Sequence, residues 1–165
     1  MYYLKFFLCA AFLLTAVNVQ AGDVKLTESW VNMVVMSTNC MKLDRNSKRI
    51  KDAFSPDAKI TVFIQGTIDE KTLTFNDDEE TLTLSPNGFI GFLKKRSKGS
   101  RLYMLSRKKI WPTISSDGTK ATTHSFLFEG SIGNRHSTGY IAEDATVELI
   151  NGEALITEMY WAFGK

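Results

Sequence analysis

The chain has few of the residues that build disulfide or metal frameworks. It contains 2 cysteines, 2 histidines, 3 prolines and 11 glycines among 165 residues. Cys9 lies in the N-terminal apolar stretch, which leaves Cys40 alone in the remainder and excludes an internal disulfide there. Without a cysteine pair or a His-x-x-x-His spacing, the sequence predicts neither a metal site nor a bound cofactor.

The sequence also has no large excess of basic over acidic residues. Twenty basic and 18 acidic residues give a formal net charge of +2. This balance provides no strong overall field, so we expect no nucleic-acid partner. With 44% hydrophobic and 23% charged residues, the composition is that of one packed domain and excludes a disordered or fibrous chain.

The first 21 residues have the pattern of a secretory signal peptide. Residues 1–5 carry one positive charge, residues 6–17 are nearly all apolar, and Val19 and Ala21 occupy the positions that signal peptidase reads. An uncleaved anchor is the alternative, but polar residues interrupt the stretch before it reaches the about 20 residues of a spanning helix. We therefore expect a signal peptide at 1–21, a mature domain at 22–165, a periplasmic or secreted location and no stable membrane anchor after cleavage.

Helical spacing comes first in the mature chain. A stripe with three- and four-residue steps predicts an amphipathic helix, and it consists of Leu26, Trp30, Met33, Val34, Ser37 and Met41. Residues 47–54 predict a short second helix that Pro56 ends.

The remainder of the chain alternates in the manner of strands. Strands are expected at 60–64, 101–110, 120–129, 136–149 and 155–163, a hairpin at 72–75 and 81–84, and a short capped helix at 85–93. Turns are expected at Asp117-Gly118, at 130–134 and at Asn151-Gly152. Consecutive hairpins without crossover helices favour an antiparallel sheet. The predicted class is α+β, with a curved antiparallel sheet wrapped on N-terminal helices.

The order of these elements resembles a known superfamily. The segment FSPDAKI at 54–60 resembles the helix-to-strand signature of nuclear transport factor 2-like proteins, which include SnoaL-like cyclases and ketosteroid isomerases. Residues 114–121 and 147–156 are similar to the last hairpins of that superfamily. The resemblance implies a single cone-shaped SnoaL-like domain over 22–165, a pocket between sheet and helices, and a homodimer formed through the outer sheet face. It implies no single chemistry.

The isomerase chemistry of this superfamily needs a carboxylate base, a tyrosine and a protonated acid. The corresponding positions fall near Val62, Met36 and Thr146, with Asp144 close to the last. Because all three roles are unfilled, we expect no ketosteroid-type proton transfer.

Two other features of the sequence have alternative interpretations. His124 shares a strand face with Thr122, Phe126 and Phe128, as either a pocket acid–base or a satisfied core residue. The basic segment 94–109 could meet an anionic partner or form a solvated loop.

Apolar periodicity predicts a ligand pocket between the first helix and the sheet, with His124 at its rim. Its expected lining is Trp30, Val34, Val62, Tyr103, Phe126, Met159 and Trp161. The same residues could form a filled core.

The leading functional hypothesis is an exported protein that binds a small apolar molecule and has no identifiable catalytic set. The alternatives are a SnoaL-like enzyme with acid–base chemistry and an interaction module that uses the outer sheet face. A pocket with convergent polar groups would favour the enzyme, a dry pocket the binder and a closed interior the interaction module.

Overall fold

The computed structural model describes residues 24–64, 67–69, 74–76, 80–98, 102–132 and 139–163. The predicted signal peptide lies outside the described residues. The elements are α1 (Glu28–Met36), α2 (Leu43–Asp52), β1 (Phe54–Ile64), β2 (Thr67–Asp69), β3 (Thr74–Asn76), β4 (Glu80–Leu84), α3 (Pro86–Arg96), β5 (Leu102–Ile114), β6 (Lys120–Ile132), β7 (Gly139–Ile150) and β8 (Glu153–Phe163).

Helices α1 and α3 begin at side-chain caps, and α1 ends earlier than the apolar spacing suggests. The Thr27 side chain accepts a hydrogen bond from the Trp30 amide at the start of α1. Because α1 ends at Met36, Met41 lies beyond it and is exposed. Ser85 caps α3, and this confirms the predicted short helix and extends it to Arg96.

The second helix and the first strand have different boundaries from those predicted. Helix α2 ends at Asp52, and β1 begins at Phe54, so Pro56 lies inside a strand. The register of β1 shifts between Phe54 and Lys59, where the strand pairing is irregular. Proline is tolerated there because no regular ladder hydrogen bond is required of it.

Among the described residues, the main sheet has the strand order β4-β1-β8-β7-β6-β5. Its neighbours are antiparallel except β1 and β8, which pair in parallel. The expectation of a purely antiparallel sheet was therefore wrong for this pair. The first and last strands of the described chain lie side by side inside the sheet, a long-range contact that local periodicity does not encode.

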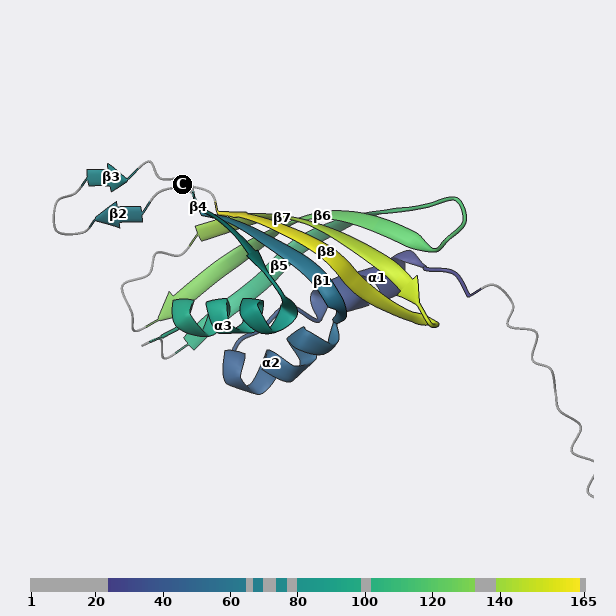
Figure 1. Ribbon diagram of the computed structural model, residues 1–165, viewed down its shortest axis with the longest axis horizontal. Helices are drawn as coiled ribbons and strands as arrows, with labels where there is room; N and C mark the ends of the chain where they lie inside the picture. Colours follow the sequence, from purple (N-terminus) through teal and green to yellow (C-terminus); the bar gives the residue numbers. More distant parts are fainter. Residues whose placement is uncertain are drawn as a thin grey trace, which may run out of the picture.

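The predicted hairpin of 72–75 with 81–84 was also wrong. Strand β3 pairs with β2 in a separate two-stranded ribbon, and β4 pairs with β1. Figure 1 shows this ribbon at one end of the main sheet.

Two tight turns depend on positive φ angles. Asn151 (φ 51°) and Gly152 (φ 82°) connect β7 and β8, as a type I′ hairpin turn requires. Gly118 (φ 74°) lies in the β5–β6 turn, where an added Cβ would lie 2.8 Å from the Lys25 Cβ. Both turns were predicted from their Asn-Gly and Asp-Gly pairs.

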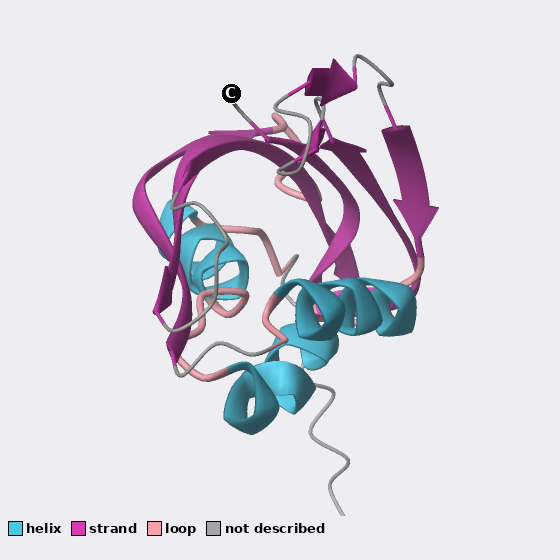
Figure 2. Cartoon of the chain, turned by 90° about the vertical axis from the view of Figure 1, so that its left-hand side faces the viewer, coloured by secondary structure: helices cyan, strands magenta, loops and turns pink. Residues whose placement is uncertain are grey.

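The sheet arches over the helices and encloses the core (Figure 2). Alternate residues of β6, β7 and β8 are buried on the helix side, while their neighbours face outward. We call these the inner and outer faces of the sheet. The α+β class, with a curved sheet around its helices, is confirmed.

Candidate functional site

Part of the predicted lining of the interior pocket lies among buried, packed side chains around Trp161. Val62 and Trp161 are opposite partners on β1 and β8, and both are completely buried. Phe89 of α3 packs edge-on against the Trp161 ring with centroids 4.8 Å apart. Phe89 therefore packs directly against one side of the Trp161 ring.

The other predicted lining residues divide between the two sheet faces. Val34, Tyr103 and Met159 are buried in the core, and Trp30 packs against it. His124 and Phe126 lie on the outer face, so their assignment to an interior pocket was wrong. Their shared face was correctly predicted, but alternation does not say which face turns inward.

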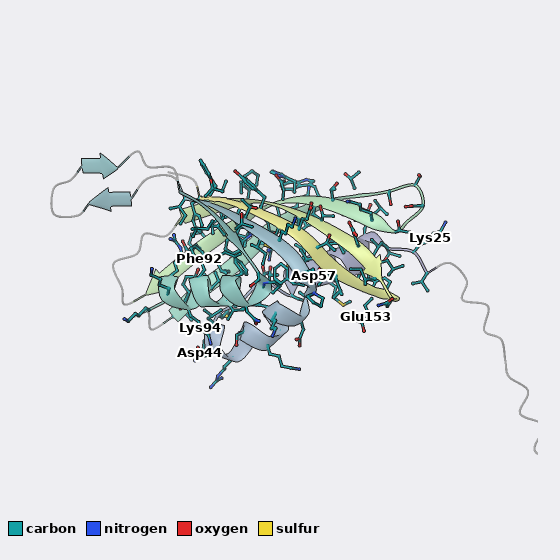
Figure 3. The ribbon with its side chains drawn as sticks, viewed as in Figure 1. Lys25, Asp44, Asp57, Phe92, Lys94 and Glu153 are labelled. Atoms are coloured by element: carbon teal, nitrogen blue, oxygen red, sulfur yellow. The ribbon has the colours of Figure 1, made fainter. Side chains whose placement is uncertain are left out.

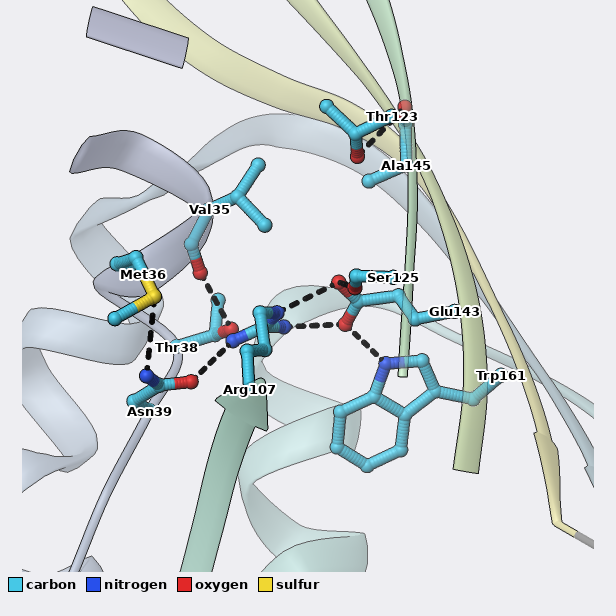
Figure 4. Close-up of polar contacts among 10 residues, drawn as sticks. All are labelled: Val35, Met36, Thr38, Asn39, Arg107, Thr123, Ser125, Glu143, Ala145 and Trp161. Atoms are coloured by element: carbon cyan, nitrogen blue, oxygen red, sulfur yellow. Dashed lines mark hydrogen bonds and ion pairs between the residues drawn. The ribbon is translucent and has the colours of Figure 1, made fainter. Parts of the chain in front are cut away.

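A buried ion pair lies at the centre of the inner face (Figure 4). Arg107 of β5 donates to both carboxylate oxygens of Glu143 of β7, with its Nε 2.9 Å from Oε1. Ser125 Oγ donates to Glu143 Oε1 at 3.1 Å, and Trp161 Nε1 donates to Oε2 at 2.5 Å. The remaining side of the guanidinium donates to Asn39 Oδ1 at 2.6 Å.

This arrangement leaves Glu143 no free lone pair for chemistry. Four donors use its two oxygens, and both charged side chains are completely buried. Glu143 occupies an inner position between Ile141 and Ala145, and a charged residue at such a position was the sequence signal that could have revealed it.

A second polar cluster lies beneath α3. Arg96 donates to both oxygens of Glu129, and its guanidinium lies 4.2 Å from the Phe163 ring centroid. The Tyr103 hydroxyl donates to Glu129 Oε1 at 2.8 Å. Burial, reinforced by the neighbouring Glu129 carboxylate, raises the pKa of Tyr103 well above its ordinary value. Tyr103 therefore stays protonated and acts as a buried donor.

These pairs divide the predicted basic segment. Arg107 is buried in the interior and Arg96 is engaged with Glu129, whereas Lys94 and Lys95 are exposed on α3. Arg101 lies outside the described residues. The charges of 94–109 therefore do not form one surface.

The outer face carries a cluster of aromatic side chains, and Figure 3 shows side chains projecting from this face of the sheet. Four of its rings are 42% to 63% exposed: Trp111, Phe126, Tyr140 and Tyr160. His124 and Phe126 meet edge to face at 5.0 Å, and Trp111 lies 6.0 Å from His124 and 6.3 Å from Phe126. Phe128 and Tyr140 are paired across β6 and β7 at 5.9 Å. We call Trp111, His124, Phe126, Phe128, Tyr140 and Tyr160 the aromatic strip.

Charged groups lie beside this strip. His124 Nδ1 is 2.7 Å from Asp144 Oδ1, its direct partner across β6 and β7. A hollow of about 510 Å³ contains this pair together with Lys59, Glu158 and several threonines. Its openness to solvent and mixture of rings, hydroxyls and both charges suit a binding surface.

The three positions that correspond to the base, the tyrosine and the acid of the isomerases do not form an acid–base set. Val62 is buried, Met36 is exposed on α1, and Thr146 lies on β7 beside Glu148. Within the part of the chain that the structure describes, no group of three or more His, Cys, Asp or Glu residues could hold a metal ion. None of the described helices is long and apolar enough to cross a membrane.

The comparisons with known proteins agree on the architecture. A crystal structure described as an NTF2-like protein with a cystatin-like fold, from Novosphingobium aromaticivorans, matches with a TM-score of 0.59 and 7% identity over 82% of this chain and 80% of that chain. The chain has the NTF2-like fold.

Other proteins with the NTF2-like fold are similarly related. One is an NTF2-like protein of unknown function from Pseudomonas putida KT2440, with a TM-score of 0.57 and 12% identity over 82% of this chain and 84% of that one. Another is the hexachlorocyclohexane dehydrochlorinase LinA-type3 from Novosphingobium barchaimii LL02, with a TM-score of 0.57 and 9% identity over 83% and 86%. No protein-family model and no curated protein matches the sequence.

Proposed function

We propose that the chain is an exported binding module that acts through the outer face of its sheet, where a second copy of the chain docks. The observation that carries this proposal is the aromatic strip. Contiguous exposed apolar side chains on a soluble protein typically mark an interaction site, because water contacts them at a free-energy cost. Aromatic residues are also enriched at the centres of protein interfaces.

A second copy is the preferred partner because the surface is complementary to itself. A two-fold interface brings the same patch together twice, so a patch with both charge signs can pair its bases with the acids of the other copy. Lys59 supplies positive charge in the outer hollow, and Asp144 and Glu158 supply negative charge.

The export part of the proposal rests on the sequence. The apolar stretch before Gly22 and the small residues at positions 19 and 21 support cleavage and release into the periplasm or the medium. The resemblance of the chain to nuclear transport factor 2-like proteins independently supports a homodimer.

Analytical ultracentrifugation of the chain from residue 22 onward tests self-association. We expect the wild type to be a dimer, and Phe126→Lys to raise its dissociation constant about thirtyfold or more, since truncating a central aromatic typically costs about 2 kcal/mol. Phe126 is 45% exposed, so a lysine is accommodated in the monomer without a buried charge.

Met33→Lys is the matched control, because it introduces the same charge at an exposed apolar residue of α1. This variant should keep the wild-type association. A wild-type monomer at about 100 μM, far above a typical specific dissociation constant, would contradict the proposal. Equal weakening by both substitutions would also contradict it.

Binding of a small apolar molecule inside the cone is the second candidate. The interior wall is largely apolar, and a structural neighbour is named for its action on hexachlorocyclohexane. Trp161→Ala separates this candidate from a filled core. A filled core loses about 3–5 kcal/mol of unfolding free energy, and added indole then stabilises the variant but not the wild type. Stabilisation of the wild type by indole would favour the interior pocket.

A further inference from the structure

A second hollow, of about 470 Å³, lies between the two N-terminal helices. Its rim is basic, and small apolar side chains and one serine accompany the cations. The residues that line it are Val34, Ser37, Arg45, Lys48, Arg49, Asp52, Ala53 and Ala154.

The positive charges of this hollow exceed the negative charge beside them. Arg45, Lys48 and Arg49 follow one another at helical steps of three and one, and therefore share a side of α2. Lys48 pairs with Asp52 at 3.4 Å, on side chains that are 91% and 58% exposed. Arg49 donates to the Asn39 carbonyl, and Arg45 makes no hydrogen bond or ion pair within the described part of the chain. Two cations of the hollow are thus uncompensated.

Three exposed methionines belong to the same α1–α2 segment of the chain as these cations. Met33, Met36 and Met41 are 43% to 62% exposed, although apolar spacing predicts Met33 and Met41 on the core stripe. Asn39 connects the two groups. Its side-chain amide nitrogen donates to Met36 Sδ at 3.3 Å, and its backbone carbonyl accepts from Arg49. The α1–α2 surface therefore combines flexible apolar side chains with a basic helix. We call Met33, Met36, Met41, Arg45, Lys48 and Arg49 the basic methionine surface.

We propose that the basic methionine surface binds the surface of an anionic phospholipid membrane. Lipid phosphates attract exposed Lys and Arg side chains without removing them from water, which fits a lysine that is 91% exposed. Unbranched methionine side chains can enter the boundary between headgroups and acyl chains. A partner with acidic groups alone would use the cations and leave the methionines without a role.

The basic methionine surface is separate from the outer sheet face. Helix α2, with Asp44 near its start, lies on the helix side of the molecule, opposite the outer face of the sheet (Figures 1 and 3). Membrane contact therefore does not compete with docking of a second copy, and this proposal does not depend on the proposed function.

Flotation of the chain from residue 22 onward with lipid vesicles tests the proposal. We expect binding to phosphatidylcholine vesicles that contain phosphatidylglycerol, and little binding to phosphatidylcholine alone. The double substitution Arg45→Gln and Lys48→Gln should lower partitioning about thirtyfold, because each cation near an anionic surface contributes about fivefold. Arg45→Lys, which keeps the charge, should bind as the wild type does.

Two further variants locate the surface. Lys25→Gln with Lys120→Gln removes two charges from exposed residues beside the β5–β6 turn, away from α2, and should change partitioning less than twofold. Equal loss in this variant would overturn the proposal in favour of a diffuse charge effect. Met33→Gln with Met41→Gln should weaken vesicle binding while leaving binding to soluble polyglutamate unchanged. Full vesicle binding by that methionine variant would overturn the membrane assignment and favour an acidic polymer.

Discussion

At the scale of single residues, the interior of this cone is organised by Glu143. The sheet places Arg107, Ser125 and Trp161 around one carboxylate, so hydrogen bonds replace the water that both charges lose on burial. The Glu143 carboxylate is therefore fully hydrogen-bonded within the protein and forms a buried polar centre.

Removing one partner of the buried pair should be more harmful than removing both. Arg107→Met should lower the free energy of unfolding by about 3–5 kcal/mol, because it leaves the Glu143 charge buried without its cation. The double variant Arg107→Met with Glu143→Leu should be more stable than Arg107→Met, since no buried charge is left in it. Urea unfolding of the two variants and the wild type measures these differences. Additive losses in the double variant would show that the two residues do not act as a pair.

At the scale of secondary-structure elements, the β5–β6 turn shows how local side chains define a hairpin. Asp117 accepts hydrogen bonds from Ser115 Oγ at 2.5 Å, from the Thr119 amide at 3.1 Å and from the Thr119 hydroxyl at 2.9 Å. These bonds, led by that from Ser115, lower the pKa of Asp117 from 3.8 to about 2. The hydrogen bonds of this turn therefore stabilise the ionised form of the Asp117 carboxylate.

The stability that Asp117 contributes should therefore depend on pH. Because the pKa of Asp117 is lower in the folded chain, its contribution is complete above 3.8 and is lost as the pH falls through about 2. Asp117→Asn should lower the Tm at neutral pH, and its difference from the wild type should shrink below the ordinary pKa. Thermal scans across this range test the expectation, with the exposed Asp57→Asn as control. A Tm difference that is the same at pH 7 and near pH 2 would contradict it.

At the scale of the whole molecule, the two proposed surfaces lie on opposite sides. The outer sheet face offers aromatic rings and both charge signs, whereas the helix side offers cations and methionines. A dimer formed through the outer sheet faces would carry its two basic methionine surfaces on opposite far sides, so one flat membrane would contact only one of them at a time.

For the molecule as a whole we also predict export and cleavage of the leader. Expression of the full chain in a secretion-competent host should yield a product that begins at Gly22, because Val19 and Ala21 present small side chains to signal peptidase. Intact-mass measurement of the exported protein identifies its first residue. Replacing Ala21 with a bulky residue, as Ala21→Tyr, should block cleavage at this position. An exported wild-type product that retains residues 1–21 would contradict the prediction.

Much of the fold could be predicted from local patterns. The Asp117-Gly118 and Asn151-Gly152 turns, the alternation along β6 and β8, and the capped helix after Ser85 all depend on neighbours within a few residues. Such features are determined by backbone sterics and side-chain period, which operate before any tertiary contact forms.

Other features depend on contacts between distant parts of the chain. Alternation along β6 separates His124 and Phe126 from Ser125 and Leu127, but both sets mix apolar and polar residues, so only packing against the helices decides which face is buried. The parallel pairing of β1 with β8 and the convergence of Arg107 on Glu143 likewise join residues far apart in the chain. The sequence by itself thus determined the turns, the strand alternation and the α+β class, because these are local. The tertiary structure alone decided which side chains form the core and which lie exposed on the outer sheet face and the helix side, because burial is a property of the assembled layers.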